Sequence, residues 1–124
     1  TVFNKGEMWR DFTYIDDIVA GVVASLDTPP EDDGLAKAGG STKPHALYNI
    51  GNHRSEKLLD FIGCVEEACG RKAEIDFQPM QPGDVVRTYA DIDAIQQDLG
   101  YQPTTGIAEG IPRFVEWFRH YHAV

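Results

Sequence analysis

The segment Arg10-Asp11-Phe12-Thr13-Tyr14-Ile15-Asp16-Asp17-Ile18-Val19 carries the strongest structural signal of this chain. It begins with a cation, places aromatic side chains at the alternate positions Phe12 and Tyr14, and continues into an apolar pattern through two aspartates. Alternation is typical of a strand, and aspartate ahead of a 3.6-residue period is typical of a helix start. The segment therefore predicts a strand that leads into a helix, with an arginine and an aromatic side chain where a ligand could be held.

The neighbouring residues extend this strand and helix in both directions. Val2 and Phe3 predict a short strand that forms a hairpin with residues 8–15, because Gly6 adopts a positive φ at little cost. The helix is expected from Asp16 or Asp17 to about Asp27, and Pro29-Pro30 ends it. Its apolar residues follow helical spacing: Ile15, Ile18, Val19, Val22 and Leu26.

The rest of the chain predicts one α/β domain over residues 1–124, with about four helices and four or five short strands. Residues 29–45 lack a core-forming period and are expected to form a loop. The remaining expected elements are a strand over 46–50, a helix capped by Ser55 and closed by Gly70, a strand over 73–77, an extended piece over 85–90, a helix from Asp91 or Asp93 to Gly100, and a last helix capped by Thr105. Because Pro112 removes an amide donor, that last helix is expected to become regular only near Gly110.

Composition argues against several classes of protein. The net charge is −9 and the pI about 4.7, whereas nucleic-acid binding normally needs a basic face. One or two well-placed arginines could still hold a small anionic ligand such as a diphosphate. No apolar run approaches the roughly 20 residues of a membrane span. Cys64 and Cys69 lie on different faces of one expected helix, which favours reduced thiols and a cytoplasmic location.

Three side chains could contact a ligand, and each has a structural alternative. The fork of donors on Arg10 matches a diphosphate, although a surface ion pair with Asp11 or Asp16 would also account for it. Phe12 could stack on a flat base or pack in the core. Arg87 could bring a second cation to the same anion or be simply solvated, and it follows a turn at residues 81–84 that could present amides or a carboxylate.

No catalytic or metal-binding set is recognisable among the other residues. The four histidines have no metal-ligand spacing, and His120 and His122 lie on different faces of a helix. Gly39-Gly40 lacks the strand–turn–helix context of a dinucleotide site, and the sequence has no Tyr-x-x-x-Lys. The residues alone therefore indicate an anion clamp without a nucleophile or base.

Five sequence segments nevertheless resemble one enzyme family, the NAD-dependent epimerase/dehydratase group of extended short-chain dehydrogenases/reductases. Within it the chain is most similar to bacterial UDP-glucuronate 4-epimerases. The segments are residues 2–18 (VFNKGEMWRDFTYIDDI), 48–52 (YNIGN), 80–85 (MQPGDV), 88–91 (TYAD), and 99–101 (LGY) with 114–118 (FVEWF). The first and third are specific to the group, and the others are common in the superfamily.

The resemblance implies that this region is the carboxyl-terminal, substrate-side part of a longer enzyme. A Rossmann domain ahead of it would bind NAD and hold the Tyr-x-x-x-Lys pair, so this chain alone is expected to bind no cofactor and to be inactive. The enzyme would oxidise C4 of a UDP-sugar and return the hydride to the other face. The resemblance assigns Arg10 to the diphosphate, Phe12 to the neighbourhood of the uracil and Asn4 to a hairpin beside the nucleotide. Relatives of the galactose type have a second arginine where this chain has Gln81-Pro82, and Arg87 is the candidate to replace it.

Two functions remain open at this point. The chain is either the UDP-sugar-binding part of an epimerase or a stand-alone binding or assembly module. In the first case the expected ligands are UDP-glucuronate and UDP-galacturonate. Without the Rossmann half, an apolar surface near Val2, Phe3, Met8 and Trp9 would be exposed, which predicts a homo-oligomer through that surface. Neither nucleic acid nor membrane is expected as a partner.

Overall fold

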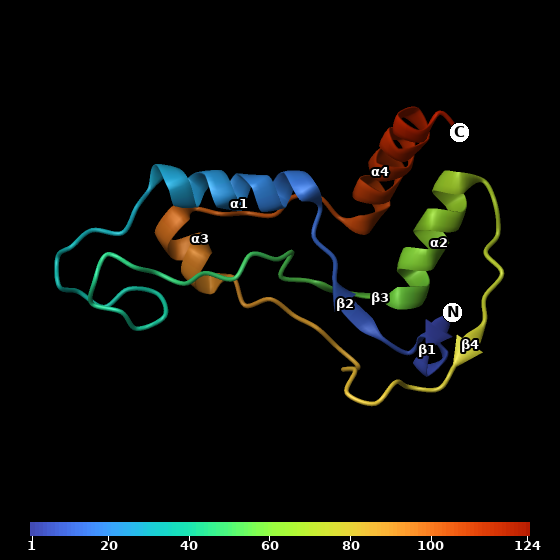
Figure 1. Ribbon diagram of the computed structural model, residues 1–124, viewed down its shortest axis with the longest axis horizontal. Helices are drawn as coiled ribbons and strands as arrows, with labels where there is room; N and C mark the ends of the chain where they lie inside the picture. Colours follow the sequence, from blue (N-terminus) through green and yellow to red (C-terminus); the bar gives the residue numbers. More distant parts are fainter.

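Helices contribute most of the regular structure in the computed structural model, which describes all residues 1–124 and confirms the α/β class (Figure 1). The helices are α1 (Ile15–Asp27), α2 (Leu58–Cys69), α3 (Asp93–Leu99) and α4 (Ile107–His122). The strands are β1 (Val2–Phe3), β2 (Trp9–Asp11), β3 (Ser55–Lys57) and β4 (Phe77–Gln78). Helix α1 lies beside α3 at one end of an elongated molecule, and α2 lies beside α4 at the other.

The strands form two small sheets, and the expected hairpin between residues 2–3 and 8–15 is wrong. Strand β1 pairs in parallel with β4, and β2 pairs antiparallel with β3. A short 3-10 turn, Asn4–Gly6, separates β1 from β2. Gly6 has a φ of +80°, and a Cβ there would lie 2.5 Å from Leu59 Cδ2. The turn therefore packs against α2 instead of bringing β1 and β2 together.

Three further sequence-based expectations about strands need correction. The segment 46–50 belongs to no strand, although Tyr48 and Ile50 pack on the core while Leu47 and Asn49 are exposed. Its side chains alternate as in a strand, but its backbone has no ladder partner. Of residues 73–77 and 85–90, only Phe77 joins a strand and only Arg87 forms a bridge, which is to Trp9.

The helix ends differ from the expected ones mainly at the start. Ser55 lies in β3 and does not cap α2, and the caps of α1 and α4 are Tyr14 and Gly106, without a side-chain hydrogen bond. Helix α4 begins at Ile107 and runs through Pro112, so the expected delay to Gly110 is wrong. The expected carboxyl ends are confirmed, since Gly70 and Gly100 adopt left-handed φ values of 67° and 66°.

The expected capping aspartate has a different and longer-range role. Asp17 is 6% exposed, and its carboxylate accepts hydrogen bonds from the backbone amides of Thr104 (3.1 Å) and Thr105 (3.0 Å). It therefore joins the first turn of α1 to the segment that leads into α4. Nearby, Gly21 lets α1 approach the core closely, because a Cβ there would lie 3.0 Å from Ile50 Cδ1.

The fully buried core is small and lies around α3. Ile92, Ile95 and Tyr101 form its centre, and Tyr48 and Ile50 are among the half-buried side chains that pack on it. The Tyr101 hydroxyl donates to the carbonyl of Gly51 at 2.9 Å. This contact holds the irregular segment 46–52 against α3 without a strand ladder.

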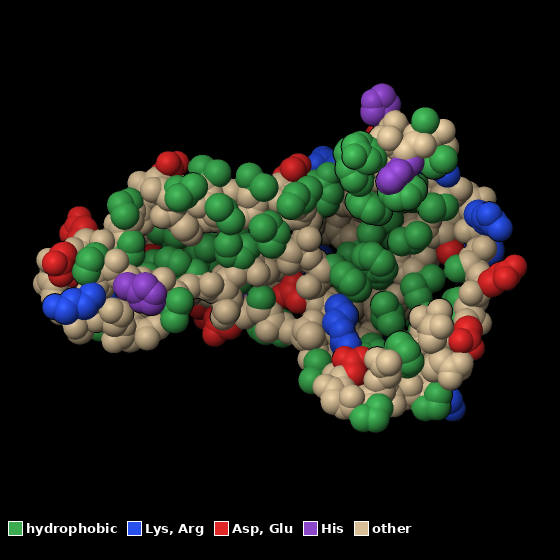
Figure 2. Space-filling view, viewed as in Figure 1, with side chains coloured by type: hydrophobic (Ala, Val, Ile, Leu, Met, Phe, Trp, Pro, Cys, Tyr) green, Lys and Arg blue, Asp and Glu red, His purple; other side chains and the backbone are tan.

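The exposed apolar surface does not lie where the sequence predicts it. Val2 and Met8 are buried, and Phe3 and Trp9 are half-buried, where β1 pairs with β4 and β2 pairs with β3. Large apolar side chains are instead exposed along α1, where Ile15 is 60% and Leu26 75% exposed, and along α4 (Figure 2). None of the helices has the length and apolar character needed to cross a membrane.

Replacing Asp17 by Asn should lower the free energy of unfolding by about 1–3 kcal/mol, because the NH2 group of the amide would face one of the two backbone N–H donors and leave it without an acceptor. Urea denaturation followed by circular dichroism measures the change. Asp16→Asn, on the exposed side of the same turn, is the matched control and should cost no more than about 1 kcal/mol. Equal effects of the two substitutions would contradict the role given to Asp17.

Alkaline pH should destabilise the fold through two tyrosines. Burial and then the charges of Asp17 and Asp11 raise the pKa of Tyr101 above its ordinary 10.0, and burial with the Asp98 hydrogen bond does the same for Tyr48. Because the unfolded chain ionises these phenols first, the free energy of unfolding should be unaffected below pH 10 and fall above it, from about pH 10 upward. Urea titrations from about pH 8 to about pH 11 test this. The Tyr48→Phe/Tyr101→Phe double variant should show a shallower fall, and an unchanged slope would contradict the assignment.

Candidate functional site

Arg10 occupies the middle of β2, which has backbone partners on both sides. Arg10 is paired with Glu56 of β3 on one side. On the other side the Trp9 amide donates to the Val86 carbonyl at 2.8 Å, and the Thr88 amide donates to the Trp9 carbonyl at 3.1 Å. Residues 86–88 therefore run beside β2 like a short third strand. This arrangement brings the loop at residues 79–85 next to Arg10.

The Arg10 guanidinium is held by contacts on this edge. Its Nη1 donates to the carbonyls of Trp9 (2.9 Å) and Val86 (3.3 Å), and its Nη2 donates to Asp84 Oδ1 at 2.9 Å. The ion pair considered from the sequence was with Asp11 or Asp16, whereas the structure gives it to Asp84. Asp84 comes from the turn at residues 81–84, so that turn does present a carboxylate.

Two donors of Arg10 remain without a protein partner. A guanidinium carries five N–H groups, and the contacts described use three of them, leaving Nε–H and one Nη2–H. The Arg10 side chain is 23% exposed, so the group is partly open to solvent. An anionic oxygen could bind there, but it would share the guanidinium with Asp84, whose Oδ1 also accepts from the Val85 amide at 2.8 Å.

The other two polar candidates do not converge on Arg10. Arg87 is exposed and is bridged to Trp9, and because neighbouring strand positions face opposite ways, it lies on the other face from Arg10. Asn4 lies in the 3-10 turn, where its Nδ2 donates to the Glu7 carbonyl at 2.8 Å. The structure thus ties Asn4 to its own turn and leaves Arg87 as a separate cation.

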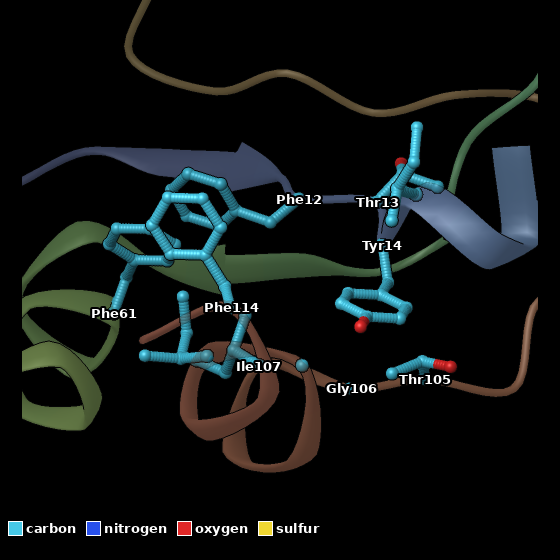
Figure 3. A pocket seen from close by; sticks show the side chains of 11 residues that line it. Phe12, Thr13, Tyr14, Phe61, Thr105, Gly106, Ile107 and Phe114 are labelled. Carbon is cyan, nitrogen blue, oxygen red and sulfur yellow. The ribbon is translucent and has the colours of Figure 1, made fainter. Parts of the chain in front are cut away.

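Phe12 lies in a mainly apolar hollow of about 340 Å³ between β2, α2 and the start of α4 (Figure 3). Its ring stacks on Phe61 with centroids 4.1 Å apart and an interplanar angle of 19°. Phe114 of α4 and Tyr14 also line the hollow, and Arg113 lies over the Tyr14 ring at 5.9 Å. One face of Phe12 is therefore already covered, and only the remaining surface could contact a ligand.

A second, more polar hollow of about 480 Å³ lies beside the segment 48–51. Asp11 lines it, but its carboxylate is occupied by the backbone amides of Asn52 (2.8 Å) and Ala90 (2.9 Å). Tyr89 at the rim contacts His53, with 2.8 Å between the tyrosine oxygen and Nε2. Asp11 therefore holds two distant backbone segments against β2. Its position directly after Arg10 in the sequence does not predict this role.

No group of three or more His, Cys, Asp and Glu side chains is arranged to hold a metal ion. Asp84 is the neighbour of Arg10 that sequence reasoning did not assign to it. Its signal is only the opposite charge, since 74 residues separate the pair. The site assignments of Arg10, Phe12, Asn4 and Arg87 stay predictions.

Comparison with known proteins gives consistent results. The family model described as GDP-mannose 4,6 dehydratase matches residues 1–114. A probable UDP-glucuronate 4-epimerase of Rhizobium meliloti is 38% identical over 123 residues, which cover 94% of this chain and 36% of that protein. UDP-glucuronate 4-epimerase 4 of Arabidopsis thaliana is 38% identical, with 97% of this chain and 28% of that protein covered.

Solved structures agree with the sequence relatives. The UDP-glucuronic acid 4-epimerase of Bacillus cereus, in complex with UDP-glucuronic acid and NAD, matches with a TM-score of 0.77 and 30% identity. The alignment covers 97% of this chain and 35% of the Bacillus protein. A UDP-glucose 4-epimerase of Thermotoga maritima with UDP-glucose matches with a TM-score of 0.78 and 25% identity, covering 98% and 35%. The chain thus spans less than two fifths of the length of these relatives, in their carboxyl-terminal part.

Replacing Phe61 by Ala should remove the stack on Phe12 and lower the free energy of unfolding by about 2–4 kcal/mol. Chemical denaturation measures the change. Phe77→Ala is the control, because Phe77 is 50% exposed and stacks on no ring, and it should cost clearly less. Equal losses in the free energy of unfolding for the two variants would show that the stack of Phe61 on Phe12 adds no stability.

Proposed function

Because the chain belongs to the GDP-mannose 4,6 dehydratase family, we propose that it is the UDP-sugar-binding part of a nucleotide-sugar epimerase acting on UDP-glucuronate. The resemblance to NAD-dependent epimerases/dehydratases of the extended short-chain type, and to UDP-glucuronate 4-epimerases, is confirmed. Its relatives and structural neighbours include UDP-sugar 4-epimerases. The choice of glucuronate over glucose is supported by the names of the relatives.

The observation that carries the proposal is the state of the Arg10 guanidinium. Three of its donors are fixed by Trp9, Val86 and Asp84, so the group is oriented before any ligand arrives. The remaining Nε–H and Nη2–H can donate to oxygens of a diphosphate, which suits the planar fork of arginine. Binding would bring negative charge next to Asp84, so part of the attraction would be lost to repulsion from that carboxylate.

NAD belongs elsewhere in this proposal. Gly39-Gly40 lies in the irregular chain between α1 and β3, and no glycine-rich turn joins a strand to a helix. We therefore assign no dinucleotide site to the residues of this chain. The NAD site and the Tyr-x-x-x-Lys pair are assigned to the part of a longer enzyme that these residues do not cover.

Within the proposed reaction, this chain binds and orients the substrate. Arg10 would hold the diphosphate, and the aromatic side of the hollow around Phe12 would lie toward the base. The side chains of Asn4 and Arg87 do not converge on Arg10. They would therefore contact the ligand only if it extends beyond Arg10. A cytoplasmic location is part of the proposal, on the ground that Cys64 and Cys69 are both free thiols.

A stand-alone binding or assembly module is the alternative. The exposed apolar faces of α1 and α4 favour it, because exposed apolar patches commonly mark a surface that contacts another protein or domain. The two functions differ in whether a UDP-sugar is recognised. Titration with the nucleotide therefore separates them.

Arg10→Ala should weaken UDP binding by about 10- to 100-fold, the loss expected for one or two charge-assisted hydrogen bonds. Isothermal titration calorimetry with UDP measures the affinity. Arg54→Ala is the control, since Arg54 is an exposed arginine paired with Glu56 and should bind like the unaltered chain. Equal heats for the Arg10→Ala variant and the unaltered chain, or no heat from the latter, would remove Arg10 from the site.

A further inference from the structure

The carboxylate of Asp84 lies directly beside the guanidinium that the proposed function assigns to a diphosphate. Its Oδ1 is 2.9 Å from Arg10 Nη2, and no other carboxylate of the chain is within ion-pair distance of Arg10. Because the two charges cancel, the pair has no excess positive charge with which to attract an anion. An anion bound there would therefore gain from hydrogen bonds of fixed direction more than from net charge.

Asp84 is held beside Arg10 by its own turn. The Asp84 amide donates to the Gln81 carbonyl at 3.2 Å and closes the turn, in which Gly83 has a φ of +84°. Asp84 Oδ1 also accepts the Val85 amide at 2.8 Å. The carboxylate therefore cannot turn away from a bound anion without breaking its contacts with both Arg10 and Val85.

The free donors of Arg10 would bring a phosphate close to this carboxylate. Asp84 accepts from Nη2, and the second N–H of the same nitrogen is one of the two donors without a protein partner. Two oxygens that accept from one nitrogen at about 2.9 Å each lie roughly 5 Å apart. That separation is shorter than the Debye length of about 8–10 Å at moderate ionic strength, so salt screens the repulsion between them only in part.

The size of this repulsion depends on how the diphosphate ends. A diphosphate that is esterified at both ends, as in a UDP-sugar, carries about two negative charges, whereas one that ends in a free phosphate, as in UDP, carries about three above pH 7. Both kinds of ligand present the same type of oxygen to Arg10. Only the repulsion from Asp84 differs between them, and it is larger for the free nucleotide.

We propose that Asp84 makes this site favour nucleotides whose diphosphate is esterified at both ends over nucleotides that end in a free phosphate. The inference rests on the proposed function, since it takes Arg10 as the diphosphate contact. Epimerisation leaves both esters of the diphosphate intact, so substrate and product meet the same repulsion from Asp84. A free nucleotide such as UDP meets more of it and competes less well for the site.

The test compares UDP with UDP-glucose by isothermal titration calorimetry at low ionic strength and about pH 8, where the terminal phosphate of UDP is ionised. Asp84→Asn keeps an oxygen for Arg10 Nη2 and removes the charge, so it should lower the ratio of the two dissociation constants, UDP over UDP-glucose, by about 3- to 10-fold. Asp84→Glu keeps the charge and should largely keep the ratio. If Asp84→Asn does not retain the circular dichroism spectrum of the unaltered chain, Asp84→Ser takes its place with the same expectation.

Asp27→Asn is the matched control. It removes one negative charge from the same total of −9, at the exposed end of α1 remote from β2 (Figure 1), and should leave the ratio unchanged. A shift of the ratio in Asp27→Asn as large as in Asp84→Asn would overturn the inference, because the effect would then be one of net charge.

The ratio also separates specificity from a purely orienting role. If Asp84 only orients Arg10, Asp84→Asn weakens both ligands by the same factor and the ratio does not change. That result overturns the inference and leaves the proposed function standing. No heat from either ligand with the unaltered chain would overturn the proposed function and, with it, this inference.

Discussion

The carboxylate of Asp17 is the contact on which most of this structure depends. It is almost fully buried and accepts the backbone amides of Thr104 and Thr105, 87 and 88 residues further along the chain. This contact fixes the start of α1 against the segment that leads into α4, and Thr105 of that segment also lines the apolar hollow. Asp11, the last residue of β2, has a similar role: its carboxylate accepts the backbone amides of Asn52 and Ala90 and so joins β2 to both segments. Two aspartates thus hold together a molecule whose buried core is small.

The sequence predicts the local elements of this fold well and the long-range ones poorly. The strand and helix around Arg10-Asp11-Phe12 follow from alternation and helical spacing, and Gly70 and Gly100 end their helices as expected. The hairpin failed because the partner of Val2 is Phe77, which no local pattern indicates. Asp16 or Asp17 was expected to cap α1, because a short polar side chain near a helix start is most often satisfied locally. The actual donors to Asp17 belong to a segment whose position depends on the whole fold.

The candidate site shows the same division. Arg10 and Phe12 could be selected from the segment in which a strand leads into a helix, and the structure places Arg10 in the middle of β2 and Phe12 directly after that strand. Asp84 could not be assigned to Arg10, because the ion pair forms only once residues 86–88 align with Trp9. Arg87 could have joined Arg10 or been solvated, and that same alignment places it on the opposite face from Arg10. The guanidinium is therefore oriented by two carbonyls and a carboxylate, and a pair of arginines is not formed.

The separation of the joined residues has a consequence for how the protein is made. Strand β1 needs residues 77–78, and Asp17 needs Thr104 and Thr105, so neither contact can form on a short nascent chain. Contacts between distant residues carry a high loop-closure entropy and slow the folding of a chain. During synthesis the ribosome must therefore release the residues up to about Thr105 before the start of α1 is fixed against the segment that leads into α4.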